Sequence, residues 1–351
     1  MTCVVVAAGL VTPVGLSLGE TAAATRARMP RLRECSWLDR RFEPFIVGRV
    51  PESGLPALAP SLANESIQAR EARMLRLAHA ALSDTLSAIP AQITPPPLLL
   101  GLPEHHTQIA IEPARFLQRL ALQSGPCFDL SASVAAPRGR ASALMALSQA
   151  VRIIESGQSP YVLVGGVDSL NDLYILGTLD REQRIRGETV SDGFTPSEGA
   201  GFILLAKDTA ITGTGLKALV RLSGSASGQE PGNLYAQAPY LGEGLAAAVS
   251  EVLAQAATDT PIQTVFSSFN GERYWAREFG VARIRNAQAF GDETQMEHPA
   301  ECFGDLGAAH GIALAAVAAH GVSEGYRRAP CLVYASSDHA DRAAVVFEGT
   351  A

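Results

Sequence analysis

Residues 153–170 read IIESGQSPYVLVGGVDSL, and this stretch carries the clearest signal for the fold. The preceding helical pattern, residues 138–156, ends at Ser156-Gly157, a pair that commonly closes a helix. Residues 161–164 then form an apolar run of strand length with no polar face. The stretch therefore predicts a helix, a tight turn and a strand buried on both faces.

Similar units recur on both sides of this stretch. Apolar runs of strand length lie at residues 3–8, 98–100, 161–164, 201–205, 219–222, 264–266, 332–335 and 343–347. Helical patterns occupy 64–84 (with Asn64 as the expected cap), 138–156, 242–255 and 306–320. Strands without a polar face that alternate with helices are typical of α/β sheets covered on both sides. The order in residues 1–210 repeats in 211–351, which predicts two similar halves around one core.

Composition excludes several classes of function. The net charge is −7, and no aromatic residues are interleaved with Lys or Arg, so nucleic acid is not expected as a partner. The apolar N-terminus contains glycines and a proline, lacks a basic n-region, and is shorter than the ~20 apolar residues of a membrane span. We therefore expect a cytoplasmic globular protein without a membrane span.

The cysteines and histidines show no metal-binding pattern. Five cysteines are widely spaced, without a CxxC pair or a partnered histidine, so neither a disulfide framework nor a metal site is predicted, and no cofactor is expected. The adjacent His105 and His106 are expected to lie in a loop.

Four stretches together resemble the β-ketoacyl synthases of the thiolase-fold superfamily. They are VVAAGLVTPVG at 5–15, IIESGQSPYVLVGGVDSL at 153–170, DGFTPSEGAGFILLA at 192–206 and ECFGDLGAAHG at 301–311. The resemblance implies a five-layer αβαβα fold of two pseudo-symmetric halves, usually a homodimer. It also implies a cysteine nucleophile at the N-terminus of a buried helix, assisted by two histidines from the second half.

The three catalytic positions that the resemblance implies hold other residues. Counting back from Gly165 places the nucleophile position at Arg140, and no cysteine lies between Cys127 and Cys302. The first histidine position holds Asn270, and the second holds Asp305. The glycine-rich turn that supplies an oxyanion-hole amide in the family is replaced by SSDHADRAAVVF at 336–347. The sequence therefore predicts that synthase chemistry is lost.

Arg140 and Asp305 stand where the family places side chains that meet at the pocket base. We hypothesise that they form a buried ion pair that fills the pocket, because a buried arginine without a partner is very costly. The alternative is that one of the two side chains points to solvent.

Cys302, Asp305 and His310 could suggest a catalytic triad. The glycine and alanine spacing of GDLGAAHG instead favours close helix packing, with Cys302 and His310 as structural residues. The candidate binding residues are Ser142, Phe194, Asn270, Glu272, Trp275 and Arg277. The last three lie on an apparent helix of aromatic and charged residues, which suggests a partner-binding surface or an ordinary solvated helix.

Three functions remain open. The first is a non-catalytic accessory or scaffold protein, since several motifs resemble thiolase-like proteins associated with type VI secretion effector modules. The second is a chain-length-factor-like subunit of a fatty-acid or polyketide synthase. The third is an acyltransferase or decarboxylase that uses Ser142 or Cys302 as nucleophile.

The partner expectations follow from these functions. The chain is expected to form a homodimer through strand pairing around residues 161–168. A further protein partner is an effector or adaptor, an acyl carrier protein, or an active synthase.

Overall fold

The computed structural model describes residues 3–105 and 110–350, so His106 lies outside the described residues. Its first half contains five strands of the large sheet, in the order β5-β4-β6-β7-β1. They are β1 (Cys3–Val11), β4 (Pro97–Leu102), β5 (Asp129–Pro137), β6 (Tyr161–Ser169) and β7 (Glu198–Lys207). β4 pairs in parallel with β5 and β6, while β7 is antiparallel to both β6 and β1.

The second half repeats this arrangement in the order β10-β9-β11-β12-β8. Its strands are β8 (Val220–Gln229), β9 (Ile262–Ser267), β10 (Phe290–Glu297), β11 (Cys331–Ser336) and β12 (Asp341–Gly349). β9 is parallel to β10 and β11, and β12 is antiparallel to β11 and β8, as in the first half. This confirms two pseudo-symmetric halves, while the division at residues 210 and 211 stays a prediction.

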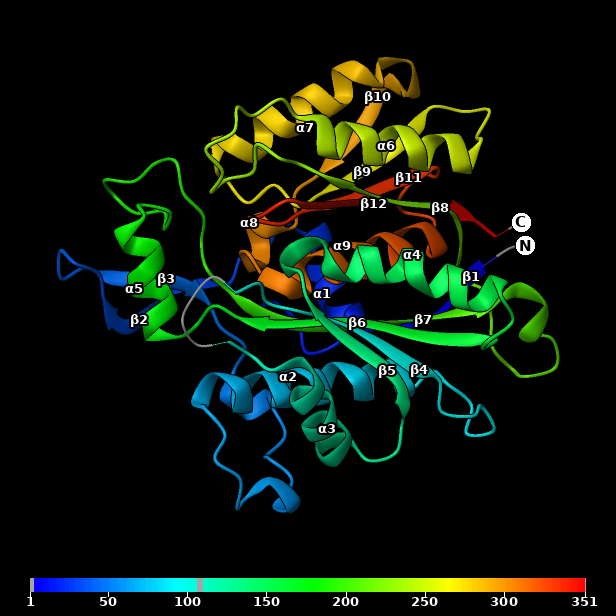
Figure 1. The fold of residues 1–351 in the computed structure, drawn as a ribbon, viewed down its shortest axis with the longest axis horizontal. Coiled ribbons are helices and arrows are strands. Elements are labelled where there is room, and N and C mark those ends of the chain that lie inside the picture. Colours follow the sequence, from blue (N-terminus) through cyan, green and yellow to red (C-terminus); the bar gives the residue numbers. More distant parts are fainter. Residues whose placement is uncertain (1–2, 106–109, 351) are drawn as a thin grey trace.

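Helices complete five layers in the order αβαβα (Figure 1). α2 (Ala69–Leu86) and α3 (Pro113–Ser124) cover the outer face of the first-half sheet, and α6 (Glu243–Ala256) and α7 (Arg273–Arg285) cover that of the second. Between the sheets lie α1 (Leu18–Arg26), α4 (Ser142–Glu155) and α9 (His310–Ser323). A smaller unit at one end contains β2 (Leu32–Leu38), β3 (Pro44–Gly48) and α5 (Leu173–Arg181). The short α8 (Ala300–Phe303) precedes α9.

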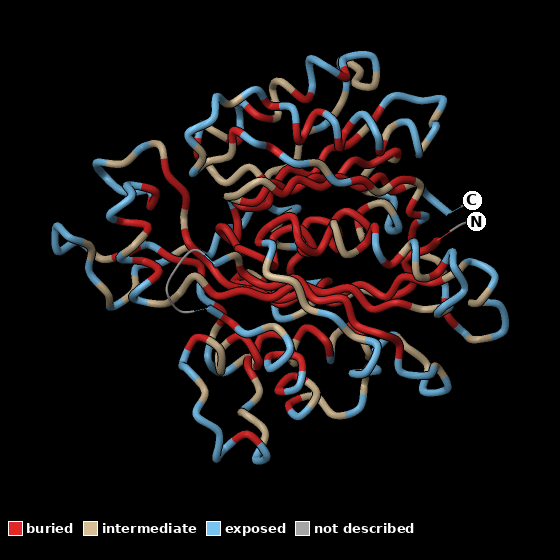
Figure 2. The backbone as a smooth tube through the Cα atoms, in the orientation of Figure 1, coloured by how far each residue is buried: buried red, intermediate tan, exposed pale blue. Residues whose placement is uncertain are grey.

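The helix α9 and the strands β7 and β11 are buried along nearly their whole length (Figure 2). Nearly every residue of α9 is buried, which explains a sequence that is apolar all round and rich in alanine. A Cβ atom on Gly311 would lie 2.5 Å from the carbonyl oxygen of Arg140, and one on Gly166 would lie 2.6 Å from that of Ala308. Glycine is therefore required where α9 begins beside α4 and β6.

The edge strands were not predicted, and one helix start was wrong. β5 and β10 lie at the two ends of the sheet and are partly exposed, so neither has a continuous apolar run. The helix predicted from Asn64 begins at Ala69 instead, with Gln68 at the cap position.

The expected dimer strand is also corrected. β6, which contains residues 161–168, has β4 on one side and β7 on the other, so its edges are not open for pairing with a second chain. The free edge of the first-half sheet belongs to β5.

Among the described residues, no helix combines the length and apolarity needed to cross a membrane.

Candidate functional site

Arg140 lies in the turn that leads into α4, and its side chain is buried. The preceding Gly139 has a φ of +66°, and a Cβ atom there would lie 2.6 Å from a carboxylate oxygen of Glu104. Glycine therefore suits this position both for its backbone conformation and for its space. The turn directs a guanidinium, instead of a thiol, toward the second half of the chain.

The buried Arg140–Asp305 ion pair predicted from the sequence is confirmed. Arg140 Nη2 lies 2.6 Å from Asp305 Oδ2, and Arg140 Nε donates to Oδ2 at 2.7 Å and to Oδ1 at 3.0 Å. Asn270 Nδ2 donates to Asp305 Oδ2 at 2.7 Å. The three positions at which the family resemblance implies catalytic side chains are thus joined in one contact set.

This contact set continues into a larger network of buried charges. Asp338, in the turn between β11 and β12, lies 2.5 Å from Arg140 Nη1 and 2.8 Å from Arg184 Nη1. Arg184 also donates to both carboxylate oxygens of Glu272, at 2.7 and 2.9 Å. We call Arg140, Arg184, Glu272, Asp305 and Asp338 the central network. Its two arginines and three carboxylates form ion pairs and hydrogen bonds with one another, in a region from which water is largely excluded.

Electrostatics keep Arg140, Asp305 and Asp338 ionised. Burial alone raises the pKa of Asp305, but the charge of Arg140 and its hydrogen bonds hold that pKa well below its usual range. The pKa of Asp338 is likewise lowered, because Arg140 and Arg184 outweigh the effect of burial. The same carboxylates raise the pKa of Arg140 despite its burial. Arg140 and the two carboxylates therefore stabilise one another's charged forms.

These lowered pKa values predict loss of stability in acid. The two carboxyls take up protons more readily in the unfolded chain, so their contribution is present above about pH 4 and is lost as the pH falls further. At pH values between its unfolded and folded pKa, each carboxyl should lower the free energy of unfolding by about 1.4 kcal/mol for every unit by which the pH falls. Urea denaturation at about pH 5 and pH 3 measures this slope. Asp338→Asn should reduce it by one carboxyl's share, and an unchanged slope would contradict the assignment.

The aromatic candidates belong to the interior of the site. Phe194 is buried, and its ring centroid lies 5.7 Å from the guanidinium carbon of Arg140 and 5.3 Å from that of Arg184. Trp275 is also buried, and the Arg140 guanidinium lies over its ring. Its Nε1 donates to Glu272 Oε2 at 2.9 Å. The interpretation of a solvent-facing binding surface is therefore wrong for Glu272 and Trp275, whereas Arg277 is exposed.

No catalytic triad is assembled around the remaining nucleophile candidates. The Ser142 hydroxyl donates to the carbonyl oxygen of Gly139 at 2.6 Å, not to a base. His310 Nδ1 lies 3.5 Å from Asp305 Oδ1. In the described part of the chain, no hydrogen bond or ion pair joins Cys302 to Asp305 or His310, and burial raises the pKa of the Cys302 thiol.

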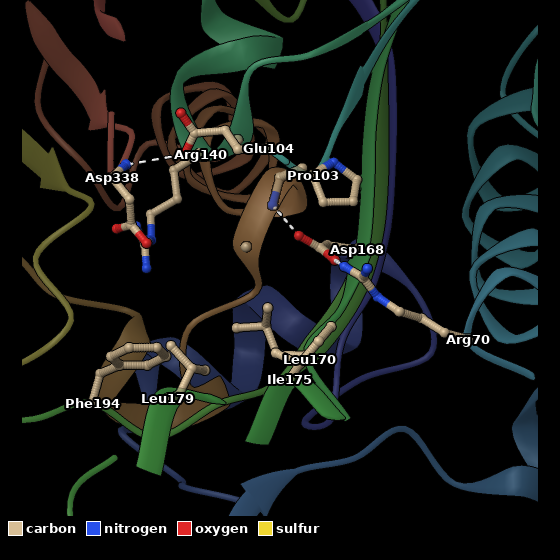
Figure 3. A pocket seen from close by; sticks show the side chains of 13 residues that line it. Arg70, Pro103, Glu104, Arg140, Asp168, Leu170, Ile175, Leu179, Phe194 and Asp338 are labelled. Carbon is tan, nitrogen blue, oxygen red and sulfur yellow. Dashed lines mark hydrogen bonds and ion pairs between the residues drawn. The ribbon is translucent and has the colours of Figure 1, made fainter. Parts of the chain in front are cut away.

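A small pocket remains beside the central network (Figure 3). Arg140 and Asp338 border one side of it, and on the other Arg70 reaches Asp168 with a 2.8 Å ion pair. Leu170, Ile175, Leu179 and Phe194 form its apolar wall. Its volume of about 60 Å³ is far below the roughly 300–1,000 Å³ of pockets that hold drug-sized ligands. In this structure the pocket has no room for an extended acyl chain.

Sequence reasoning missed Asp338 and Arg184. The stretch 336–347 was interpreted only as a turn that lacks the family's glycines. Its Asp338 contacts two arginines. One signal was available in the sequence. A buried arginine has five N–H groups, so more than one acceptor is expected near Arg140. No cluster of metal-ligating side chains occurs within residues 3–105 and 110–350.

Part of the chain matches a known protein family, and its fold is similar to that of solved structures. The family model described as the β-ketoacyl synthase N-terminal domain matches residues 132–210. No match was found among curated proteins. Among solved structures, the chain is similar to the oxazolomycin ketosynthase domain of Streptomyces albus JA3453, with 16% identity and a TM-score of 0.81, over 100% of this chain and 75% of that one.

Two further solved structures are assemblies. A ketosynthase in complex with its chain length factor from Xenorhabdus doucetiae matches with 17% identity and a TM-score of 0.75, over 99% of this chain and 98% of that one. A type II polyketide ketosynthase in complex with its acyl carrier protein matches with 15% identity and a TM-score of 0.78, over 100% and 99%. At these identities the likeness shows the fold.

Proposed function

We propose that this chain, which has the thiolase-like fold of β-ketoacyl synthases, is a non-catalytic accessory protein that works through a protein partner. The observation that carries the proposal is the buried Arg140–Asp305 pair at the positions of the nucleophile and a histidine. A guanidinium held by two carboxylates is neither a nucleophile nor a base at neutral pH. The small volume of the adjoining pocket supports the same function.

A condensation assay tests the loss of chemistry. We expect purified protein, incubated with acyl-CoA and malonyl-acyl carrier protein, to yield no decarboxylation or condensation product above a protein-free blank. The reason is that Arg140, Asn270 and Asp305 offer no thiol or hydroxyl to accept an acyl group, and the N–H groups of Arg140 and Asn270 already bind carboxylates. An active ketosynthase is the positive control, and product formed by the wild-type chain at repeated turnover would contradict the proposal.

A chain-length-factor-like role is the second candidate. It is favoured by the similarity to a ketosynthase in complex with its chain length factor. The free edge of β5, where Leu130 and Val134 are exposed, offers a place for strand pairing with a second copy or with another subunit. Copurification discriminates the candidates: an active synthase or acyl carrier protein supports this role, and an effector or adaptor supports a secretion accessory. The association with type VI secretion modules and the homodimer remain predictions.

An acyltransferase with another nucleophile is the third candidate. The hydroxyl of Ser142 is already donated to a backbone carbonyl, and the thiol of Cys302 is buried with a raised pKa, so neither is activated. Intact mass after incubation with labelled acyl-CoA would reveal a stoichiometric adduct if this candidate holds. Its loss in Ser142→Ala or Cys302→Ala would identify the residue.

A further inference from the structure

A second cavity lies away from the central network and shares no lining residue with the pocket beside Arg140. Its volume is about 220 Å³. Its walls come from the end of α1, the end of β10, the segment around α8, and the turn after α9. The polar side chains that matter here are Arg26, Arg28, His298, Tyr326 and Arg327.

The cavity has more positive than negative side chains around it. Three arginines line it, together with Glu297 and Glu301. Glu297 is neutralised by Arg327, at 2.8 Å. Arg26 stacks on the Tyr326 ring, with its guanidinium carbon 4.8 Å from the ring centroid. Arg26 and Arg28 are exposed, and neither forms an ion pair within the described residues. With Glu297 paired, these two cations face the single carboxylate of Glu301 at the cavity.

Three buried polar atoms at this cavity lack a hydrogen-bond partner among the described residues. They are Nδ1 of His298, the hydroxyl oxygen of Tyr326 and Nε of Arg327. A buried polar atom without a partner is costly, and such atoms are normally satisfied by water or by a bound molecule. All three atoms belong to side chains that line the cavity, so unsatisfied hydrogen-bonding groups are concentrated in its walls.

We propose that this cavity binds a small oxyanion, carried by a phosphate or a carboxylate group. Arginine provides N–H groups in a geometry that suits both oxyanions, and the Tyr326 hydroxyl and Arg327 Nε are donors in the cavity wall that have no partner among the described residues. Burial lowers the pKa of His298, so its imidazole is a neutral partner with one donor and one acceptor nitrogen. The cavity is smaller than the roughly 300–1,000 Å³ that drug-sized ligands need, which suits a small anion.

Titration calorimetry on the full chain tests the proposal. One arm uses inorganic phosphate and the other malonate, at matched ionic strength set with sodium chloride. We expect saturable binding in at least one arm, and the stronger arm identifies the oxyanion class. Arg26→Gln should weaken binding about tenfold, because a charge-assisted hydrogen bond is lost. Tyr326→Phe, which removes only the hydroxyl group, should weaken it about threefold or more.

Arg328→Gln is the matched control, because Arg328 follows the cavity residue Arg327 in the sequence but does not itself line the cavity. It should leave the affinity within about twofold of wild type. The melting temperature of each variant without ligand, and its rise with added phosphate or malonate, separates lost binding from lost folding. Absence of saturable binding in both arms, or equal affinity in Arg26→Gln and Arg328→Gln, would overturn the proposal.

Discussion

Arg140→Met should lower the free energy of unfolding by about 3–5 kcal/mol, because it removes the cation and leaves Asp305 and Asp338 buried with too few positive partners. Methionine keeps much of the side-chain volume, so the loss reports mainly on charge. The measurement is urea denaturation at neutral pH.

Arg138→Met is the matched control for this variant. Arg138 lies two residues earlier and pairs with Asp341 at 3.1 Å, but its side chain is 51% exposed. Exposed ion pairs contribute about 0–1 kcal/mol, so this variant should remain near wild type. Equal, small losses in both variants would show that the central network does not stabilise the fold.

The second large effect is expected at Arg342, which is fully buried in β12. Its Nε donates to Glu278 at 2.6 Å, and its Nη1 donates to the carbonyl oxygens of Ser337 and His339 at 2.7 and 2.5 Å. Arg342→Leu therefore leaves Glu278 unpaired and releases the turn that presents Asp338. We expect a loss of about 3–5 kcal/mol in the free energy of unfolding.

The turn itself provides a second readout for Arg342→Leu. Amide hydrogen exchange across residues 336–341 should accelerate before global unfolding, because the carbonyl oxygens of the turn lose their donor. Arg221→Leu is the control, since the Arg221–Glu348 pair on neighbouring strands has a 48% exposed arginine. Unchanged exchange and a loss no larger than that of Arg221→Leu would rule out a positioning role for Arg342.

Much of the fold could be predicted from the sequence because its central strands have no polar face. β6 and β11 are buried on both sides, so their apolar runs stand out, and the repeated order of elements reveals two halves. β5 and β10 were missed because an edge strand needs no continuous apolar run. Their position depends on parallel pairing with β4 and β9, which lie far from them in the sequence.

The site was only partly predictable for a related reason. The motif positions brought Arg140 and Asp305 together, since both lie in the turns that lead into α4 and α9. Asp338 and Arg184 reach the same place from loops whose course local sequence does not determine. Trp275 was predicted on a surface because its charged neighbours suggested solvent, whereas those charges include Glu272 and Glu278, which are paired in the interior.

The fold and the site lead to different expectations for activity. The arrangement of layers is that of the ketosynthases to which the chain is similar, and a small pocket lies beside Arg140. Yet the pocket is narrow and its base is occupied by paired charges.

A double-mutant cycle of Arg140→Met and Asp305→Leu tests the central claim most directly, namely that Arg140 and Asp305 form an energetically coupled buried ion pair. Arg140→Met leaves one cation for three carboxylates, and Asp305→Leu leaves Nε of Arg140 without its acceptor, whereas the double variant removes both members of the pair. We predict a coupling energy of about 2–3 kcal/mol between the two positions, measured from the unfolding free energies of the four proteins. Additive effects, within about 0.5 kcal/mol, would contradict the claim.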